Sequence, residues 1–280
     1  FALALVWLVA ATIQDIRKRE IPNWLSFSLI IFALAFRALY SVFYSDIRFF
    51  LLGLLGLGIF FILAEIFYYA RVFAGGDSKF LISLGCILPG TSLYLSLIFL
   101  GFFIFILMFV GGFYGLVYSL VLVSLNRNNF AKEFKKQLKM RKMFVVIGLV
   151  LALLSLIFVF YIGDGLFLFF PLIIIAFPFL YIYSKAIEES CMIKLVNGKE
   201  VTVGDWLYEE VRVGRKKIKP YWEGLSEEEV RILKGYRGKV KVKYGIPFMP
   251  AFLISFILFI LAEFLWYSYR SFFDFFLSYF

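Results

Sequence analysis

Long apolar stretches separated by short polar segments dominate the chain. At about 20 apolar residues per membrane-crossing helix, the pattern predicts eight membrane segments. They fall near 1–14, 24–44, 49–73, 77–90, 92–125, 143–162, 165–184 and 247–267. Pro89-Gly90 divides the long stretch 77–125, so 77–90 is predicted as a short or tilted helix. A secretory signal peptide is the alternative for the first segment, but its positive charges follow the apolar run instead of preceding it.

One polar stretch, residues 185–246, is long enough to fold outside the membrane. Asn197-Gly198 stands between two strand-like runs and predicts a β-hairpin. Asp205 is expected to cap a short helix, and Ser226 opens a capping box that starts a helix to about residue 234. Lys239–Tyr244 alternates like a strand. The sequence therefore predicts an all-α polytopic membrane protein with a small mixed α/β cytoplasmic module.

The same pattern divides the chain into five parts. They are a membrane-embedded domain at 1–125, a basic cytoplasmic loop at 126–142, two further membrane helices at 143–184, the α/β module at 185–246, and a final helix with an aromatic tail at 247–280. The tail Ser271–Phe280 either lies flat in the outer interface or continues the last helix.

Composition supports the membrane assignment and narrows the chemistry. Of the 280 residues, 63% are hydrophobic and only 17% are charged, against roughly 45–50% and about 25% in soluble domains. The chain has no histidine, which excludes Ser-His-Asp and Cys-His mechanisms and the commonest zinc sites. Its two cysteines, Cys86 and Cys191, cannot form a CxxC metal motif. We therefore predict no metal and no cofactor, and acid–base chemistry from Asp, Glu, Lys or Tyr.

The net charge of +10 is distributed unevenly. Basic residues gather in the segments 16–20, 126–142 and 185–246, whereas the intervening turns are short and nearly neutral. This is the positive-inside pattern, which places the three basic segments in the cytoplasm. Anionic lipid is the expected partner of these charges, and nucleic acid is not expected.

Two aspartates stand where an apolar run meets a polar segment. Asp15 lies in the stretch 14–23, whose sequence is QDIRKREIPN, and Asp77 lies in the stretch 74–79, AGGDSK. A carboxylate at a membrane boundary is costly to desolvate and often has a task. Two carboxyls held close together share one proton, and peptide hydrolysis by an aspartic protease needs that state. Asp15 and Asp77 are therefore the predicted catalytic residues.

The neighbouring residues fit a shaped site. Gly75 and Gly76 allow close approach of a substrate strand, because they carry no Cβ. Pro22 suits the first turn of the next helix and shortens the connection after Asp15. Lys79 either extends to the membrane interface or modulates the charge at Asp77.

These two motifs resemble those of the type IV prepilin peptidases and archaeal preflagellin peptidases, membrane aspartic proteases of the GxGD kind. In that family an Asp followed by basic residues and Ile-Pro-Asn comes after the first span, matched here by Asp15, Arg17, Arg19 and Ile21-Pro22-Asn23. The second Asp lies in a Gly-x-Gly-Asp motif with a Lys two residues on. Here the first Gly is Ala74, and Lys79 is in place. The resemblance covers roughly 1–125, and 224–250 is more weakly similar to the carboxy-terminal extension of archaeal members.

The resemblance implies a peptidase that removes the leader of pilin-like or archaellin precursors on the cytoplasmic side. It implies no methyltransferase activity here, because the paired CxxC segment of bacterial members is missing. The acids Glu20, Glu188 and Glu189 are candidates to receive a basic leader.

Three alternatives keep the same aspartates. They are a helix-cutting protease of the presenilin type, a proton-coupled membrane carrier, and a non-catalytic scaffold whose motif is altered at Ala74. The sequence does not indicate an oligomeric state.

Overall fold

The computed structural model describes residues 1–214 and 216–277, with side chains through residue 267. Its chain forms two compact units. The first contains residues 1–116 and the chain from Ile246 onward, and the second contains Val117–Gly245.

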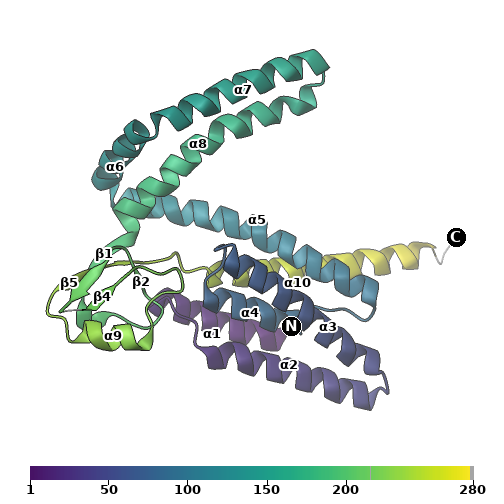
Figure 1. The fold of residues 1–280 in the computed structure, drawn as a ribbon. Helices are drawn as coiled ribbons and strands as arrows, with labels where there is room; N and C mark the ends of the chain where they lie inside the picture. Colours follow the sequence, from purple (N-terminus) through teal and green to yellow (C-terminus); the bar gives the residue numbers. More distant parts are fainter. Residues whose placement is uncertain (215, 278–280) are drawn as a thin grey trace. The chain divides into compact units, whose positions relative to one another are not determined.

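The first unit is a bundle of six helices (Figure 1). They are α1 (Ala2–Lys18), α2 (Asn23–Phe43), α3 (Ile47–Tyr69), α4 (Gly75–Gly85), α5 (Leu93–Leu125), whose last residues belong to the second unit, and α10 (Met249–Leu277). Helix α4 packs against α3 and α2, and α1 packs against α10. Fully buried phenylalanines fill the core, among them Phe60, Phe80, Phe103, Phe252 and Phe256.

Six helical stretches in the described part of the chain are long and apolar enough to cross a membrane: Asn23–Phe43, Ile47–Tyr69, Leu93–Leu125, Lys142–Ile162, Gly165–Met192 and Met249–Tyr267. Each of the eight predicted segments contains a helix, although α4 ends at Gly85, within the segment 77–90. Helices α1 and α4 are not among these six, so eight spans are not confirmed. Helix α4 has 11 residues and is therefore about 16 Å long, roughly half of a hydrocarbon core of about 30 Å. The last helix continues to Leu277, and residues 278–280 of the predicted tail lie outside the described residues.

In the second unit, α6 (Arg127–Met140) is followed by α7 (Lys142–Ile162), η1 (Gly165–Leu168), α8 (Phe169–Ile187) and the π-helical turn η2 (Glu188–Met192). Most of the segment 126–142, predicted as a basic cytoplasmic loop between membrane helices, is helical. It contains no Gly or Pro, and Phe130, Phe134 and Leu138 recur at helical spacing. The Phe130 ring packs edge-on against Tyr183 of α8, with ring centroids 5.6 Å apart.

The α/β module follows η2 in the second unit. Strands β1 (Ile193–Asn197), β5 (Lys239–Lys243) and β2 (Trp206–Leu207) form an antiparallel sheet in the order β1-β5-β2, while β3 (Val211–Val213) pairs with β4 (Lys216–Ile218). Helix α9 (Glu227–Lys234) starts at the predicted capping box, where the Ser226 Oγ accepts the Glu229 N–H. The predicted helix after Ser226 and the predicted strand at 239–244 are thus present.

Two predictions in the module are wrong. Asn197-Gly198 does not turn a hairpin: Gly198–Glu200 is a 3-10 turn (η3), and β1 pairs with the distant strand β5. Glycine is needed there because a Cβ on Gly198 would lie 2.2 Å from the Leu233 carbonyl oxygen of α9. Asp205 does not cap a helix. Its carboxylate accepts the Thr202 N–H at 2.7 Å, and β2 follows directly.

Arg37 of α2 secures the far end of α4. Its guanidinium is buried and donates to the carbonyl oxygens of Cys86 at 2.6 Å, Ile87 at 3.2 Å and Pro89 at 2.6 Å, all just after α4. It also donates to the Phe49 carbonyl of α3 at 2.8 Å. A helix that ends among apolar neighbours leaves carbonyls without water, and each must find a donor. Arg37 is that donor.

We expect Arg37→Leu to lower the stability of the first unit, because several buried carbonyls lose their donor at about 1–3 kcal/mol for each group left unsatisfied. The matched control is Arg48→Leu, which removes the same charge from an exposed side chain. Thermal unfolding in detergent should show a clearly lower midpoint for Arg37→Leu than for Arg48→Leu. Equal midpoints would contradict this account of α4.

Candidate active site

Asp15 continues the buried stripe of α1. The helix buries Ala4, Leu8, Ala11 and Asp15, which are spaced by three or four residues and share one face, together with Thr12 beside Ala11. Only 6% of Asp15 is exposed. One carboxylate oxygen accepts the backbone N–H of Met249 at 2.9 Å. The apolar stripe that packs α1 into the bundle therefore also brings this carboxylate inside, where it has a hydrogen-bond donor.

Asp77 lies in the first turn of α4. Its carboxylate accepts the backbone N–H of Ala74, the N-cap residue, at 3.3 Å, and 9% of the residue is exposed. Ala74 itself is extended, with φ −73° and ψ 163°. These angles suit alanine as well as glycine. The departure from the family motif at position 74 therefore imposes no backbone strain.

The two motifs come together in space. The Lys79 ammonium donates to the Asn23 side-chain oxygen at 2.8 Å, which joins the starts of α4 and α2. Gly76 faces Ile21, where an added Cβ would lie 3.2 Å from the isoleucine side chain. Asp15 and Asp77 are close enough for their charges to interact. Pro22 caps α2 in an extended conformation, with φ −68° and ψ 138°.

The structure thus gathers the predicted site residues Asp15, Asp77, Asn23, Gly76 and Lys79. Gly75 begins α4 beside Tyr68, with which a Cβ would make an ordinary contact at 3.7 Å. Two buried carboxyls with interacting charges hold one proton between them more readily than none, because the doubly ionised pair is desolvated and self-repelling. Such a pair can act as one base and one acid. Among the described residues, no group of three or more His, Cys, Asp or Glu side chains is arranged to hold a metal ion.

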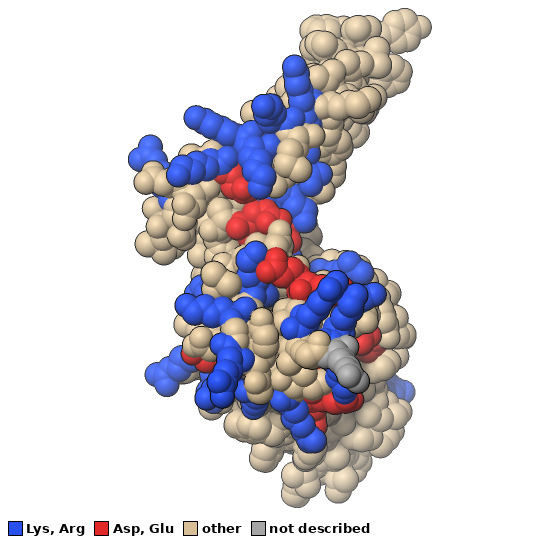
Figure 2. Space-filling model, turned by 60° about the vertical axis from the view of Figure 1, so that its left-hand side comes forward, with Lys and Arg blue, Asp and Glu red and all other residues tan. Residues whose placement is uncertain are grey.

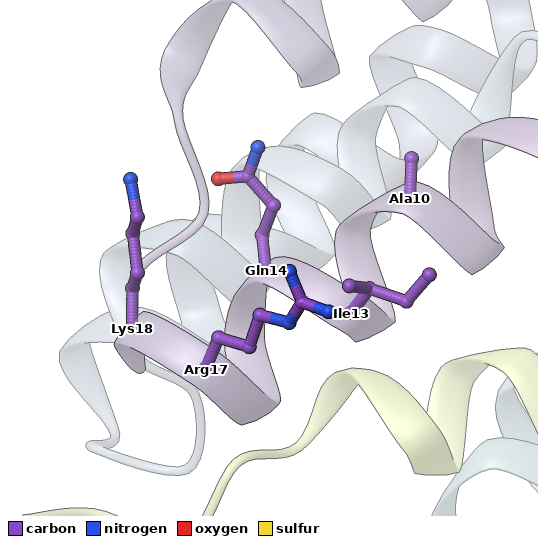
Figure 3. Close-up of a pocket in the computed structure, with 5 residues that line it drawn as sticks. All are labelled: Ala10, Ile13, Gln14, Arg17 and Lys18. Carbon is purple, nitrogen blue, oxygen red and sulfur yellow. The ribbon is translucent and has the colours of Figure 1, made fainter.

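An open groove runs along a different side of α1 (Figure 3). It is lined by Ala10, Ile13, Gln14, Arg17 and Lys18. None of these residues belongs to the buried stripe that carries Asp15. The groove is therefore not the opening of the two-aspartate site. Arg17 and Lys18 are exposed at its polar end, as expected for residues that anchor a helix at a membrane surface.

Sequence reasoning missed the Met249 N–H, because a backbone donor has no signature of its own. The nearest signal was the weak similarity of 224–250 to archaeal members, which indicated no role in the site.

Two of the acids expected to receive a leader already have partners within the second unit. Glu188 accepts from Lys185 at 2.8 Å and from Lys243 at 2.7 Å. Glu189 accepts the Tyr208 hydroxyl at 2.5 Å, and this bond is the main reason that the pKa of Tyr208 rises to about 12.

We expect Gly76→Val to destabilise the protein more than Gly75→Val. Both changes introduce the same side chain in the first turn of α4, but only position 76 faces Ile21 at 3.2 Å. Overpacking of this kind costs about 1–3 kcal/mol, so the thermal-unfolding midpoint should fall further for Gly76→Val. A larger fall for Gly75→Val would refute the close contact between the motifs.

Comparison with known proteins also finds a similarity in the region that contains Asp15 and Asp77. The sequence model of the type IV leader peptidase family matches residues 2–125, which include both aspartates. A preflagellin peptidase of Methanococcus maripaludis is 31% identical over 89 residues, which cover 32% of this chain and 38% of that protein. This chain therefore matches well under half of the length of that relative. No solved structure matches the chain. The family match thus covers less than half of the chain, the part that carries both Asp15 and Asp77.

Proposed function

We propose that this chain is a membrane aspartic endopeptidase that removes the leader peptide of type IV pilin-like or archaellin precursors on the cytoplasmic side. The supporting observation is the meeting of two buried, charge-coupled carboxyls, Asp15 and Asp77, inside the family-matched region. The name of the archaeal relative, preflagellin peptidase, supports the substrate class.

In the proposed reaction the ionised member of the pair removes a proton from water, whose oxygen attacks the scissile carbonyl carbon. The protonated member donates its proton to the carbonyl oxygen, which gives a tetrahedral diol. Collapse of the diol re-forms the carbonyl, breaks the C–N bond and passes a proton to the leaving amine. The pair returns to its starting state with one proton, so no cofactor is consumed.

The position of the aspartates suits cleavage beside a membrane helix. Asp15 lies in the last turn of α1 and Asp77 in the first turn of α4, at the ends of helices rather than at their centres. A precursor whose helix lies in the bilayer would present the junction between its leader and that helix near these helix ends. Glu20, five residues after Asp15, remains a candidate for contact with a basic leader, because Glu188 and Glu189 hold other partners.

We expect Asp15→Asn and Asp77→Asn each to abolish cleavage of archaeal pilin and archaellin precursors by detergent-purified protein, because an amide can neither take up nor supply the proton. The loss should exceed about 10³-fold, the scale of a general acid–base contribution. Asp164→Asn is the matched control. Asp164 is an exposed cap of η1, and cleavage should be unchanged.

Full activity of either active-site variant would remove the two-carboxylate mechanism. If the folded wild-type protein cuts no precursor of the panel, the carrier and scaffold alternatives gain. The conformation of Ala74 gives the scaffold no support, because alanine is unstrained there.

We also propose that helix α6 binds anionic lipid. It directly follows α5 and directly precedes α7, both long enough to cross a membrane. Segment 126–142 carries seven basic residues and one acid: Arg127, Lys132, Lys135, Lys136, Lys139, Arg141, Lys142 and Glu133. Lys and Arg side chains also crowd the face drawn in Figure 2, with Asp and Glu among them. A basic helix near the membrane surface attracts acidic lipid headgroups by about 1 kcal/mol for each Lys or Arg.

A variant with Lys132, Lys135 and Lys139 changed to Gln should retain anionic phospholipid at least about tenfold more weakly in native mass spectrometry, since three attractive charges are lost. The control changes Lys199, Lys219 and Lys234 of the module, which are also exposed and remove the same charge. Equal retention by the two variants would argue against a role for α6.

A further inference from the structure

The segment Ile246–Phe252, at the start of α10, contacts both halves of the candidate active site. It lies more than a hundred residues beyond the family-matched region 2–125, yet it belongs to the same compact unit as α1 and α4. It contacts α1, which carries Asp15, and the chain just before α4, which carries Asp77.

On the first side, Met249 is held by two residues of α1. Its N–H donates to the Asp15 carboxylate at 2.9 Å, in a buried position, and the Thr12 hydroxyl donates to its carbonyl oxygen at 3.4 Å. Thr12 and Asp15 are one helical turn apart on the buried stripe. Pro250 has no N–H, so Met249 provides the first backbone donor of α10. Asp15 thus accepts from the N-terminus of this helix.

On the second side, Phe248 contacts the chain that leads to Asp77. Its ring centroid lies 5.4 Å from that of Phe73, the residue before Ala74. Phe252 adds a second ring at 5.7 Å from Phe73. Gly111 of α5 makes room for this arrangement, because a Cβ there would lie 2.5 Å from the Phe248 ring. The aromatic contacts therefore fix the segment that begins α4.

We propose that Ile246–Phe252 is a positioning element of the two-aspartate site, in which the Met249 N–H holds Asp15 as the ionised member and the Phe248 ring holds the Asp77 segment against it. This inference rests on the proposed function for its catalytic meaning. It assigns Asp15 as the base that takes the water proton and Asp77 as the acid.

The surroundings of the two carboxyls support this division. A hydrogen bond from a helix N-terminus favours a carboxylate over a carboxylic acid. Asp77 also lies at such an N-terminus, that of α4, so the difference lies in the length of the two bonds. The bond from Met249 to Asp15 is 2.9 Å long, against 3.3 Å from Ala74 to Asp77. The charged groups that act on Asp15 are the Arg19 guanidinium, which also favours its ionised form, and Asp77 itself. The negative charge of an ionised Asp15 disfavours ionisation of Asp77.

The direct test follows the Met249 amide in the wild-type protein. The chain has five methionines, so selective ¹⁵N-methionine labelling gives a small set of amide signals, and Met249→Leu identifies the one from position 249. That signal should move with pH as Asp15 titrates. The movement should vanish in Asp15→Asn and persist in Asp77→Asn. A signal that does not move, or moves equally in Asp15→Asn, overturns the proposal.

A second test uses cleavage. Met249→Pro removes the N–H at the first position of α10, where helices accept proline, and the preceding Phe248 is non-helical, as proline requires. Met249→Leu keeps the N–H and an apolar side chain. The acid limb of the pH–rate profile should lie about one pH unit higher in Met249→Pro than in Met249→Leu, because the ionised Asp15 loses a donor. Coincident profiles contradict the assigned roles.

The two tests separate the inference from the proposed function. If wild-type protein cuts no precursor, the proposed function fails, and the amide titration still decides whether Met249 responds to Asp15. If cleavage occurs but the amide does not titrate, the peptidase stands and the positioning element falls. Failure of Met249→Pro to fold leaves the wild-type titration as the deciding measurement.

Discussion

Polar groups buried among apolar helices must find hydrogen-bond partners, and the first unit is organised around this requirement. The Asp15 carboxylate accepts the Met249 N–H, the Asp77 carboxylate accepts the Ala74 N–H, and the Arg37 guanidinium donates to the carbonyl oxygens that follow α4. The Asp15 bond joins α1 to α10 and the Arg37 bonds join α2 to the end of α4, whereas the Asp77 bond lies within the first turn of α4. Polar side chains, a predicted catalytic residue among them, therefore also help to fix how the helices pack.

The shortness of α4 matters for the site. Because the helix has only 11 residues, its first turn and its end both lie near the bundle core. The end is held by Arg37 and by close backbone contact with α3, where a Cβ on Gly56 would lie 2.1 Å from the Gly85 carbonyl oxygen. The start is held by the Gly76–Ile21 contact and the Lys79–Asn23 bond. Asp77 is thus carried by a helix fixed at both ends, which is the kind of support that a catalytic geometry needs.

The physical unit that contains the two aspartates is discontinuous in sequence. The family match ends at Leu125, but the compact unit ends near Leu116 and resumes at Ile246. Residues 117–245 form a unit of their own, in which ion pairs such as Glu188 with Lys185 and Lys243 are internal. Helix α10, which follows this unit in the sequence, supplies the Met249 N–H that the Asp15 carboxylate accepts. A site described only by its family motifs would therefore lack one of its supports.

The sequence by itself determined the features that depend on local pattern: the apolar helices, the two aspartate motifs, and the α9 capping box at Ser226, because periodicity and capping act over a few residues. Tertiary structure decided the rest. Asn197-Gly198 reads locally as a hairpin, but the approach of α9 to Gly198 and the pairing of β1 with β5 prevail. Phe130 of helix α6 meets Tyr183 of α8, with α7 between these two helices in the sequence. The meeting of Asp15 with Asp77, the Arg37 bonds and the Met249 N–H involve residues up to 234 positions apart. Only the folded chain could bring these together, since no local pattern encodes which backbone group a buried carboxylate will meet.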